Sequence, residues 1–386
     1  MLTPHAQHRT ITTPSEFEAL APAWDELVRR AARPSPFLVH GWLAAQWRHH
    51  HPDLQPQVEA VFDGGDLVGA LPLEIVRRRG VTVARLLGHH HAALGDVVCD
   101  PRDGGRVVPQ LLAAVPASGA DYADLFGFAQ ESMLWRAARE RRLPLVQRVE
   151  APTLDLSEGW NDVYHRKTSS KKRNLHKRRR RQLGEVGNLE VTLARTEDEL
   201  LNALEEAFLV HDLRWQGRPD GSGFTTEVGK RFQRAAIRTL AKQQIPRILT
   251  LRIDGRPVAF HYYLLFSRSM YVYRLAFDPA LARYSPGQVA TLEAIEAAAE
   301  EGATRVEFLG GDERYKMELA DRQEPLFELV GLPASARGAV TAWAVRRTIQ
   351  TRLALKRSER LRSLYVEGLR PVREARARMG EARGTG

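Results

Sequence analysis

The sequence predicts an α/β (α+β) protein built from two similar units in tandem, each a mixed twisted sheet flanked by helices. Two observations predict this fold class. Strand patterns with period two alternate with helical patterns that have an apolar face. One order of elements also occurs twice along the chain. We therefore expect an N-terminal unit over 1–156, a basic helical segment over 157–184, a C-terminal unit over 185–336, and a basic helical tail over 337–386.

The first half begins with a helix signature. Pro14-Ser15 precedes apolar residues at helical spacing, as at the start of an amphipathic helix. The first copy of the repeat follows over about 57–128, as two strands around an Asp-Gly turn, a third strand, a loop, a helix and an apolar strand. A helix near 133–143 and a strand near 146–156 close this half.

The second half repeats that order. A strand near 188–195, a helix over 197–216, a glycine-rich loop over 218–224 and a helix from 227 come first. Two strand patterns then flank the turn Asp254-Gly255-Arg256, and a third strand, a loop, a helix and an apolar run follow up to about 311. Val68–Leu71 aligns with Val258–His261, which supports an internal duplication.

The charge and the cysteine content restrict the function. The net charge of +10 is confined to two segments: residues 163–184 hold ten Lys/Arg and no acid, and residues 337–386 have a net charge of +9. The rest of the chain is acidic, which argues against a uniformly basic nucleic-acid coat. The single Cys99 excludes an intrachain disulfide, and no apolar stretch is long enough to cross a bilayer. We expect a protein of a bacterial cytoplasm without a signal segment.

The loop before the helix of the second copy is the best candidate for a binding site. Ser285-Pro286-Gly287-Gln288 places proline at the first helical position and glycine where backbone can approach a ligand closely. The free N–H groups of such a helix start suit a diphosphate, with Arg283 as a further contact. The first copy has Asp100 and Asp103 in the equivalent loop, and these carboxylates would repel a diphosphate.

Together these motifs resemble the Fem/CelD-like branch of the GNAT acyltransferase superfamily, whose members have two GNAT units in tandem. The resemblance covers about Phe17–Leu319 and rests on the order of several short motifs: Pro36–Trp42, Leu67–Leu73, Gly95-Asp96, the serine/basic helix from Ser169, His211–Trp215, Gly221–Phe224, the Pro286-Gly287 loop and Val306–Lys316. It implies that an acyl group moves from acyl-CoA, or from aminoacyl-tRNA, to an amine. The phosphate loop Arg283–Gln288 has fewer basic residues and glycines than is usual in the superfamily.

The resemblance, with residue chemistry, gives candidates for each role. As catalytic groups we expect Glu307, His211 and Asp312, because the acids follow the strand after the cofactor helix and His211 shares a helix face with Arg214. Lys316 joins the cofactor-binding candidates. The substrate-binding candidates are Arg214, Trp215, Phe224, His261, Tyr273 and Tyr315. We expect no metal, since His89–His91 are consecutive and have no partner at ligand spacing.

The sequence leads us to an acyl-CoA-dependent N-acyltransferase that uses acetyl-CoA or a longer acyl-CoA without a covalent enzyme intermediate. One alternative is an aminoacyl-tRNA-dependent transferase, since the cations at Arg166–Arg181 suit tRNA or another polyanion. The acidic body of the same chain could also bind these cations. A second alternative is a non-catalytic binding protein on the same fold. The amine acceptor (a small molecule, a sugar or a peptide), the acyl length and the oligomeric state stay open.

Overall fold

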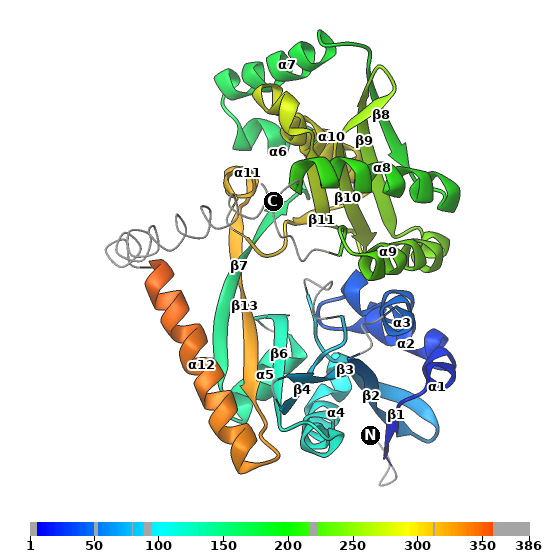
Figure 1. The fold of residues 1–386 in the computed structure, drawn as a ribbon, viewed down its shortest axis with the longest axis vertical. Helices are drawn as coiled ribbons and strands as arrows, with labels where there is room; N and C mark the ends of the chain where they lie inside the picture. The colour runs from blue at the N-terminus through cyan, green and yellow to red at the C-terminus, as the bar shows by residue number, and fades with distance from the viewer. Residues whose placement is uncertain are drawn as a thin grey trace, which may run out of the picture.

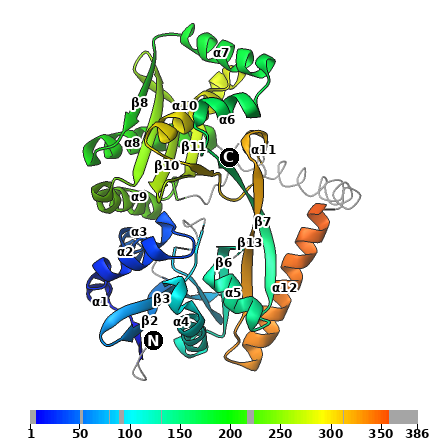
Figure 2. The same ribbon diagram turned by 180° about the vertical axis from the view of Figure 1, so that it is seen from behind.

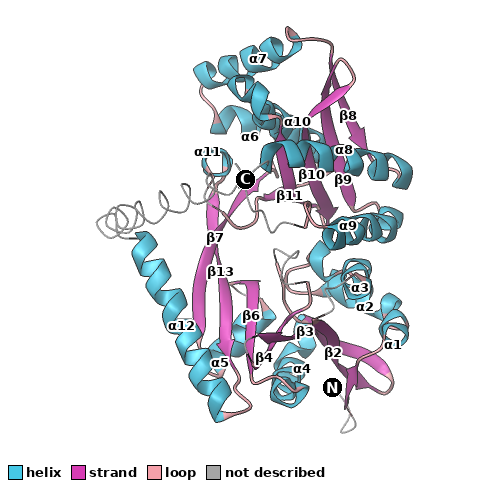
Figure 3. Cartoon of the chain, in the orientation of Figure 1, coloured by secondary structure: helices cyan, strands magenta, loops and turns pink. Residues whose placement is uncertain are grey.

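The protein consists of two lobes joined by a pair of long strands (Figure 1). The computed structural model describes residues 6–49, 53–78, 80–88, 94–130, 132–215, 223–311 and 313–357. Helices and strands are distributed through both lobes (Figure 3), and the predicted α/β class is confirmed. In this part of the chain no helix is long and apolar enough to span a membrane.

The first lobe contains a sheet and five helices before the chain crosses to the second lobe. Its strands are β1 (Gln7–Ile11), β2 (Leu54–Asp63), β3 (Asp66–Arg78), β4 (Val81–Leu86), β5 (Val98–Cys99) and β6 (Tyr122–Ala129). Its helices are α1 (Pro14–Glu18), α2 (Ala21–Arg30), α3 (His40–Arg48), α4 (Pro101–Ala114) and α5 (Met133–Glu140). The single helix expected from residue 14 is therefore two helices, and β1 has no counterpart among the predicted elements.

The second lobe follows the same plan. Its strands are β8 (Leu189–Ala194), β9 (Pro246–Ile253), β10 (Arg256–Phe266), β11 (Ser269–Phe277) and β12 (Arg305–Glu307). Its helices are α6 (Trp160–Lys167), α7 (Ser170–Gly184), α8 (Glu197–Trp215), α9 (Glu227–Leu240), α10 (Pro286–Glu300) and α11 (Arg314–Leu319). The basic segment is thus helical, as predicted, and Ser169 caps α7, because its hydroxyl accepts a hydrogen bond from the Lys172 N–H.

The two lobes share one continuous sheet because they exchange strands. The strand order is β1-β2-β3-β4-β6-β13-β7-β12-β11-β10-β9-β8, and β5 pairs with β3. Strand β7 (Leu145–Asp155) leaves the first lobe to pair with β12, while β13 (Arg322–Gly331) returns from the second lobe to pair with β6. The β7–β13 pair crosses the expected division at residue 156 and holds the lobes together (Figure 2).

Separate cores cover the two faces of the second lobe's sheet. Helix α10 packs with Val306 and Met270 on one face, and α8 and α9 pack with Tyr262 and Tyr273 on the other. The alternation of side chains along β10 and β11 explains this division. Helix α12 (Ala336–Arg357) lies beside the central strands β6, β7 and β13, so the predicted helical tail is confirmed as far as residue 357.

Candidate active site

A splay between two parallel strands opens the sheet of the second lobe. Strands β11 and β12 pair only from Ser269–Arg305 to Tyr271–Glu307, whereas β11 continues to Phe277. The register between β10 and β11 also skips Tyr273, which makes a bulge at the point where the two parallel strands separate. In the described chain, the β12-facing edge of β11 after Tyr271 therefore has no strand partner and can bind an extended ligand.

The N-terminus of α10 lies at the end of this open edge. Ser285 has a left-handed φ of 55°, and its side chain makes no capping hydrogen bond. Its carbonyl accepts from the N–H groups of Gln288 and Val289. A Cβ on Gly287 would lie 2.9 Å from the Phe277 ring, so only glycine lets this turn pack against the end of β11. The helix start thus offers its positive end to an anion.

A cavity of about 1160 Å³ lies in front of this helix start. Its lining combines Ser285 and Gln288 with Tyr315 of α11 and with cations from α7. The α7 and α11 cations that line it are Lys171, Lys172, Arg178, Arg179 and Arg314. Glu318 is the one acid in the lining, and it is bound to Lys172 and Arg314. The cavity is therefore cationic at the place where α10 exposes its N–H groups.

A chain of hydrogen bonds joins α6, α7 and α10 beside the cavity. The Gln288 amide nitrogen lies 3.1 Å from His176 Nε2, and His176 Nδ1 lies 2.8 Å from the Tyr164 hydroxyl. Because an amide N–H can only donate, His176 Nε2 accepts and Nδ1 carries the proton. Burial, with Lys172 and Arg179 nearby, lowers the pKa of His176, which favours this neutral form. Arg179 donates to the Gln288 amide oxygen.

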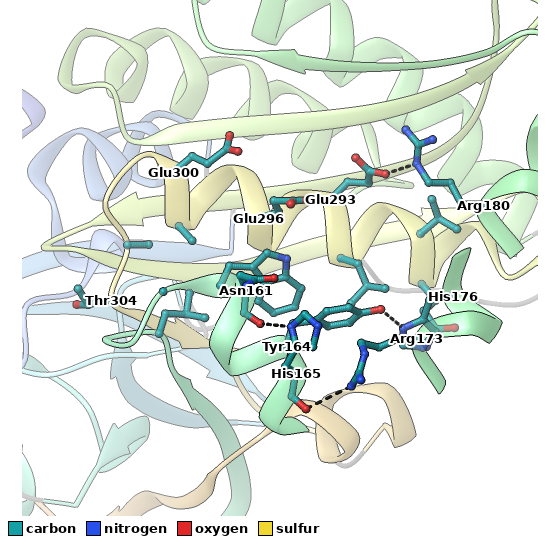
Figure 4. Close-up of a pocket in the computed structure, with 18 of the residues that line it drawn as sticks. Asn161, Tyr164, His165, Arg173, His176, Arg180, Glu293, Glu296, Glu300 and Thr304 are labelled. Atoms are coloured by element: carbon teal, nitrogen blue, oxygen red, sulfur yellow. Dashed lines mark hydrogen bonds and ion pairs between the residues drawn. The ribbon is translucent and has the colours of Figure 1, made fainter. Parts of the chain in front are cut away.

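The hydrogen-bonded residues His176, Arg179 and Gln288 also separate the cationic cavity from a second cavity, of about 740 Å³. Figure 4 shows Tyr164, His176 and Arg173 on one side of it and the α10 carboxylates Glu293 and Glu296 on the other. Three residues, His176, Arg179 and Gln288, line both cavities. A ligand at the α10 N-terminus would therefore contact the wall of the second cavity as well.

The basic helix α7 is partly bound by the acidic body of the protein. Arg180 pairs with Glu293 of α10, and Lys172 pairs with Glu318 of α11. From α6, Arg166 and Lys167 both pair with Asp321. These contacts fix α7 against the α10 N-terminus, while Lys171, Arg178 and Arg179 still line the cavity. The sequence predicts two partners for the basic segment Arg166–Arg181: a polyanion such as tRNA, or the acidic part of the same chain. The structure contains the contacts with the acidic part of the chain.

The equivalent site in the first lobe is closed. The Asp100 carboxylate caps α4 and accepts from the N–H of Arg102, whose side chain also binds it and lowers the pKa of Asp100 to about 2. The segment around Gly95 lies between β4 and β6. The Gly95 N–H donates to the carbonyl of Gly127 in β6, and a Cβ on Gly95 would lie 2.5 Å from Leu86 of β4. The chain's own residues therefore occupy both the helix start and the splay.

Asp96 secures this closure. Its buried carboxylate accepts hydrogen bonds from the backbone of Val97, Met133 and Leu134, which fixes the segment on the start of α5. The Gly95-Asp96 motif, one of those that carry the family resemblance, thus has a structural role: it fills the space between β4 and β6.

The comparisons with known proteins agree with this geometry. A family model described as "Acetyltransferase (GNAT) domain" matches residues 170–317. The structure is similar to that of FemX, with a TM-score of 0.57 and 10% identity over 83% of this chain and 96% of that one. The chain has a tandem GNAT fold, as the resemblance implies.

Two further structures are similar to this chain. The C-terminal domain of a putative lysylphosphatidylglycerol synthetase from Agrobacterium fabrum has a TM-score of 0.54 and 15% identity, over 86% of this chain and 95% of that one. A tandem GNAT protein from the clavulanic acid biosynthesis pathway has a TM-score of 0.50 and 13% identity, over 85% and 99%. No curated protein matches the sequence at a significant level.

Glu307 and His211, the two predicted catalytic residues that the structure describes, have different neighbours. Glu307 is buried and bound to Arg33 at 3.0 Å and to Arg305 at 2.7 Å, in a cluster that includes Glu324. Together with Tyr271 it lines a separate cavity of about 580 Å³, and not the cationic cavity at the start of α10. Both of its carboxylate oxygens accept hydrogen bonds from guanidinium groups. Asp312 lies outside the described residues.

The residues predicted on α8 reach the open edge from the other side of the sheet. His211 is buried, 5.3 Å from Phe224 and 6.0 Å from Trp215 between ring centres. Arg214 lies 4.7 Å from the centre of the Phe277 ring. Since Phe277 also contacts Gly287, the C-terminal end of α8 and the start of α10 meet at this ring.

The remaining substrate-binding candidates lie in different surroundings. Phe224 is fully buried and stacks on Phe260, and the loop 216–222 before it lies outside the described residues. Tyr273 accepts a hydrogen bond from Gln233 on the α9 face of the sheet. His261 lies in the core on the opposite, α10 face, where burial lowers its pKa to about 3. These two residues therefore cannot contact one small substrate together.

Of the predicted cofactor-binding residues, Ser285, Pro286, Gly287 and Gln288 form the α10 start. Arg283 is exposed and lies over the Tyr284 ring, 4.6 Å from its centre. The Lys316 ammonium is held within its own turn by the Gly310 carbonyl and the Glu313 carboxylate. Tyr315, proposed for substrate, does line the cationic cavity. Among the described residues no group of three or more acids, histidines or cysteines could hold a metal; His89–His91 lie outside them.

The sequence reasoning missed several residues of the site. Arg178 and Arg179 were seen only as part of a basic run, and His176 and Tyr164 were not singled out. The spacing of α7 could have placed His176, Arg179 and Leu183 on one face, because residues three and four apart are neighbours on a helix. Nothing in the sequence connects Arg33 with Glu307, which lies 274 residues away.

Proposed function

We propose that the protein transfers an acyl group from acyl-CoA to an amine, with the donor bound in the cationic cavity of the second lobe. One observation carries this proposal: the splay and helix start are open at Tyr271–Phe277 and Ser285–Gln288, while the first lobe closes both with its own residues. The GNAT domain match over residues 170–317 covers the open copy.

The two parts of the donor suit two parts of the site. The diphosphate would accept hydrogen bonds from the start of α10, with Arg178 and Arg179 adding positive charge. The pantetheine arm has two amides, and the free edge of β11 after Tyr271 can pair with them as a neighbouring strand would. This arrangement would bring the thioester towards the bulge at Tyr273.

The reaction needs no covalent enzyme intermediate. The neutral amine nitrogen attacks the thioester carbonyl carbon, the C–N bond forms and the C–S bond breaks. The amine loses one proton and the departing sulfur gains one. Tyr315 lines the cavity, and burial raises the pKa of its phenol well above the usual value. Its O–H therefore stays protonated and can donate to the thiolate.

The acceptor would approach from the α8 side. Arg214 lies against Phe277 and can bind a carboxylate or phosphate of the acceptor. His211, one turn before Arg214 on α8, is our candidate to take the proton of the amine. The ion-paired Glu307 is a weaker candidate, and we assign it to the contact between the lobes.

The purified protein should be incubated with acetyl-, hexanoyl- and palmitoyl-CoA and a panel of amines, with free thiol as the readout. We expect one donor to release thiol only when an amine is present. Mass spectrometry of the protein as isolated would identify a co-purified donor or acceptor. If no acyl-CoA binds in calorimetry, the donor assignment is wrong.

An aminoacyl-tRNA donor is the second candidate. The observation in its favour is the cationic wall of α7, where Lys171, Arg178 and Arg179 line the cavity from one helix. Binding to tRNA would weaken steeply with salt, with a log–log slope that falls by about one for each phosphate contact removed. Salt titrations of tRNA and of CoA binding separate the two donors. A non-catalytic protein would bind ligand but release no thiol with any amine.

A further inference from the structure

The first lobe packs against the second at the place where β11 leaves β12. Helices α3 and α9 lie side by side there (Figures 1 and 2), and the Thr239 hydroxyl of α9 donates to the Gly41 carbonyl of α3 at 3.0 Å. Before α3, the Pro34 carbonyl accepts a hydrogen bond from the Tyr271 hydroxyl at 2.7 Å. Tyr271 belongs to the last pair of the short β11–β12 ladder, so this contact lies where the open edge begins.

The same part of the first lobe surrounds Tyr273, the bulged residue of β11. The ring of Trp42, from α3, is nearly perpendicular to the Tyr273 ring, with 5.2 Å between the ring centres. The Phe37 ring lies 5.9 Å from Tyr273 by the same measure. Trp42 and Phe37 are both fully buried. First-lobe side chains therefore form one wall around the bulge of the second lobe.

A hydrogen bond from α9 adds a second contact to the same phenol. The Gln233 amide nitrogen donates to the Tyr273 hydroxyl at 2.7 Å, and Gln233 is fully buried. Trp42 also packs on Phe232, the residue before Gln233, with 5.0 Å between the ring centres. Helices α3 and α9 thus hold Tyr273 and each other.

Strand pairing does not fix Tyr273. The β10–β11 register passes from Val272 to Arg274 and leaves Tyr273 opposite no residue of β10. On the other side, the pairing of β11 with β12 has already ended at Tyr271. The contacts of the Tyr273 side chain therefore determine where this part of β11 lies.

We propose that Gln233 and Trp42 are positioning residues for acyl transfer, which hold Tyr273 and, through it, the β11 bulge that receives the thioester. This proposal rests on the proposed function, in which the donor arm lies along β11 beyond Tyr271. Tyr273 is 7% exposed and lies in the core between α3 and α9, so it acts through its backbone and not by contact with a substrate. Misplacing a reacting group by about 1 Å can cost about 100-fold in rate.

The proposal gives the closed first lobe a role in the site of the second. Its own helix start is capped by Asp100, and its splay is filled by the segment around Gly95. Its α3 instead supports the bulge next to the open edge. The alternative is that the same contacts only join the lobes, and in that case their loss would lower stability without a specific effect on turnover.

The test compares Tyr273→Phe and Gln233→Leu, which each remove the hydrogen bond between these residues, with Trp42→Phe, which shrinks the ring from the first lobe. The donor and amine are those that the panel of acyl-CoAs and amines identifies. We expect kcat to fall about tenfold in each variant, with the dissociation constant of acyl-CoA within about twofold, because the cationic cavity is unchanged. The double variant Tyr273→Phe/Gln233→Leu should lose no more than either single variant, because both changes remove one interaction.

Tyr262→Phe is the matched control. It removes the hydroxyl of another fully buried tyrosine on the same face of the sheet, and that hydroxyl has no hydrogen-bond partner among the described residues. Its kcat should stay within about twofold of the unchanged protein. Thermal melts show which variants are folded, and Tyr273→Phe, which keeps the ring, decides the outcome if Gln233→Leu does not fold.

Hydrogen–deuterium exchange of the ligand-free protein tests the positioning without any activity. The backbone N–H groups of residues 271–277 should exchange about tenfold faster in Tyr273→Phe and Gln233→Leu than in Tyr262→Phe. If no acyl-CoA is turned over, the proposed function is wrong, and exchange alone decides whether these residues hold the bulge. Unchanged exchange would overturn the proposal. So would faster exchange with unchanged kcat, or an equal loss of kcat in Tyr262→Phe.

Discussion

The guanidinium of Arg214 lies 4.7 Å from the centre of the Phe277 ring. The Cδ1–Cε1 edge of this ring packs against Gly287 at the start of α10, where an added Cβ would lie 2.9 Å from the ring. One aromatic side chain thus separates the helix end proposed for the acceptor from the helix start proposed for the donor. Acyl transfer requires that two substrates meet, and Phe277 marks the place where they would do so.

The first prediction separates binding of the acceptor from binding of the donor. Arg214→Leu should lower kcat/KM for the acceptor at least tenfold, because it removes the cation proposed to bind the acceptor. The dissociation constant of acyl-CoA should change less than twofold. Steady-state kinetics and calorimetry measure the two effects. Arg234→Leu is the control, since Arg234 of the neighbouring helix α9 is bound to Glu205 of α8. Equal loss of donor affinity would contradict the assignment.

The second prediction concerns the start of α10. Gly287→Ala should weaken acyl-CoA binding about tenfold, which corresponds to about 1.4 kcal/mol. A Cβ at this position lies 2.9 Å from Phe277, so the helix start must shift. Gly105→Ala is the matched change near the start of α4, where a Cβ meets nothing within 4 Å, and should leave binding unchanged. An unaffected Gly287→Ala protein would show that the donor does not contact this turn.

The third prediction tests the role of Tyr315. Tyr315→Phe should lower kcat about 100-fold, a size typical for loss of a general acid. KM should stay nearly constant, because the ring still fills the cavity wall. Donors whose thiol is more acidic should recover part of the rate, since their leaving group needs less help. A rise in KM with unchanged kcat would instead assign Tyr315 to binding alone.

The fourth prediction distinguishes a proton acceptor from a structural ion pair. Glu307→Gln should lower the free energy of unfolding by about 3 kcal/mol, because it leaves Arg33 and Arg305 to share Glu324 as their remaining carboxylate. The kcat of the folded protein should change little. Glu185→Gln, which breaks the exposed pair with Arg181, should cost under about 1 kcal/mol. Loss of kcat without loss of stability would restore Glu307 as the base.

The fifth prediction is a pH dependence of stability. Burial lowers the pKa of His261 to about 3 in the folded state, while an unfolded histidine titrates near 6.5. The unfolded state therefore takes up a proton first, and stability falls as the pH drops from about 6.5 towards 3. Between pH 7.5 and 5, the unchanged protein should lose about 2 kcal/mol more than His261→Leu in urea unfolding. Parallel losses would contradict a buried neutral His261.

Local patterns predicted most of the elements but not how they pair. Periodicity identified α8, α10 and β10 because amphipathic helices and alternating strands show in a short window. The exchange of β7 and β13 could not be predicted, since strand pairing depends on contacts between residues far apart in sequence. The strand β13 itself was missed. Its proline and glutamates, at Glu324-Pro325 and Glu328, weaken the alternation that marks a strand.

The residues of the candidate site also fall into two groups: those that local sequence patterns predict, and those whose contacts join distant segments. The Pro286-Gly287 turn could be found because proline and glycine have local conformational reasons to begin a helix there. The ion pair of Arg33 with Glu307 and the hydrogen bond of His176 with Gln288 could not, since each joins segments more than a hundred residues apart. The carboxylate of Glu307, expected as a catalytic group, is instead bound by Arg33 and Arg305.

The most direct measurement of the central claim is an isothermal titration of the full-length protein with acetyl-CoA, made alongside Gly287→Ala and Gly105→Ala. We predict one donor site per chain, weakened about tenfold by the change at Gly287 and unaffected by the change at Gly105. Two sites per chain, or a loss of affinity that follows Gly105 instead, would show that the first lobe binds the donor and would contradict the account.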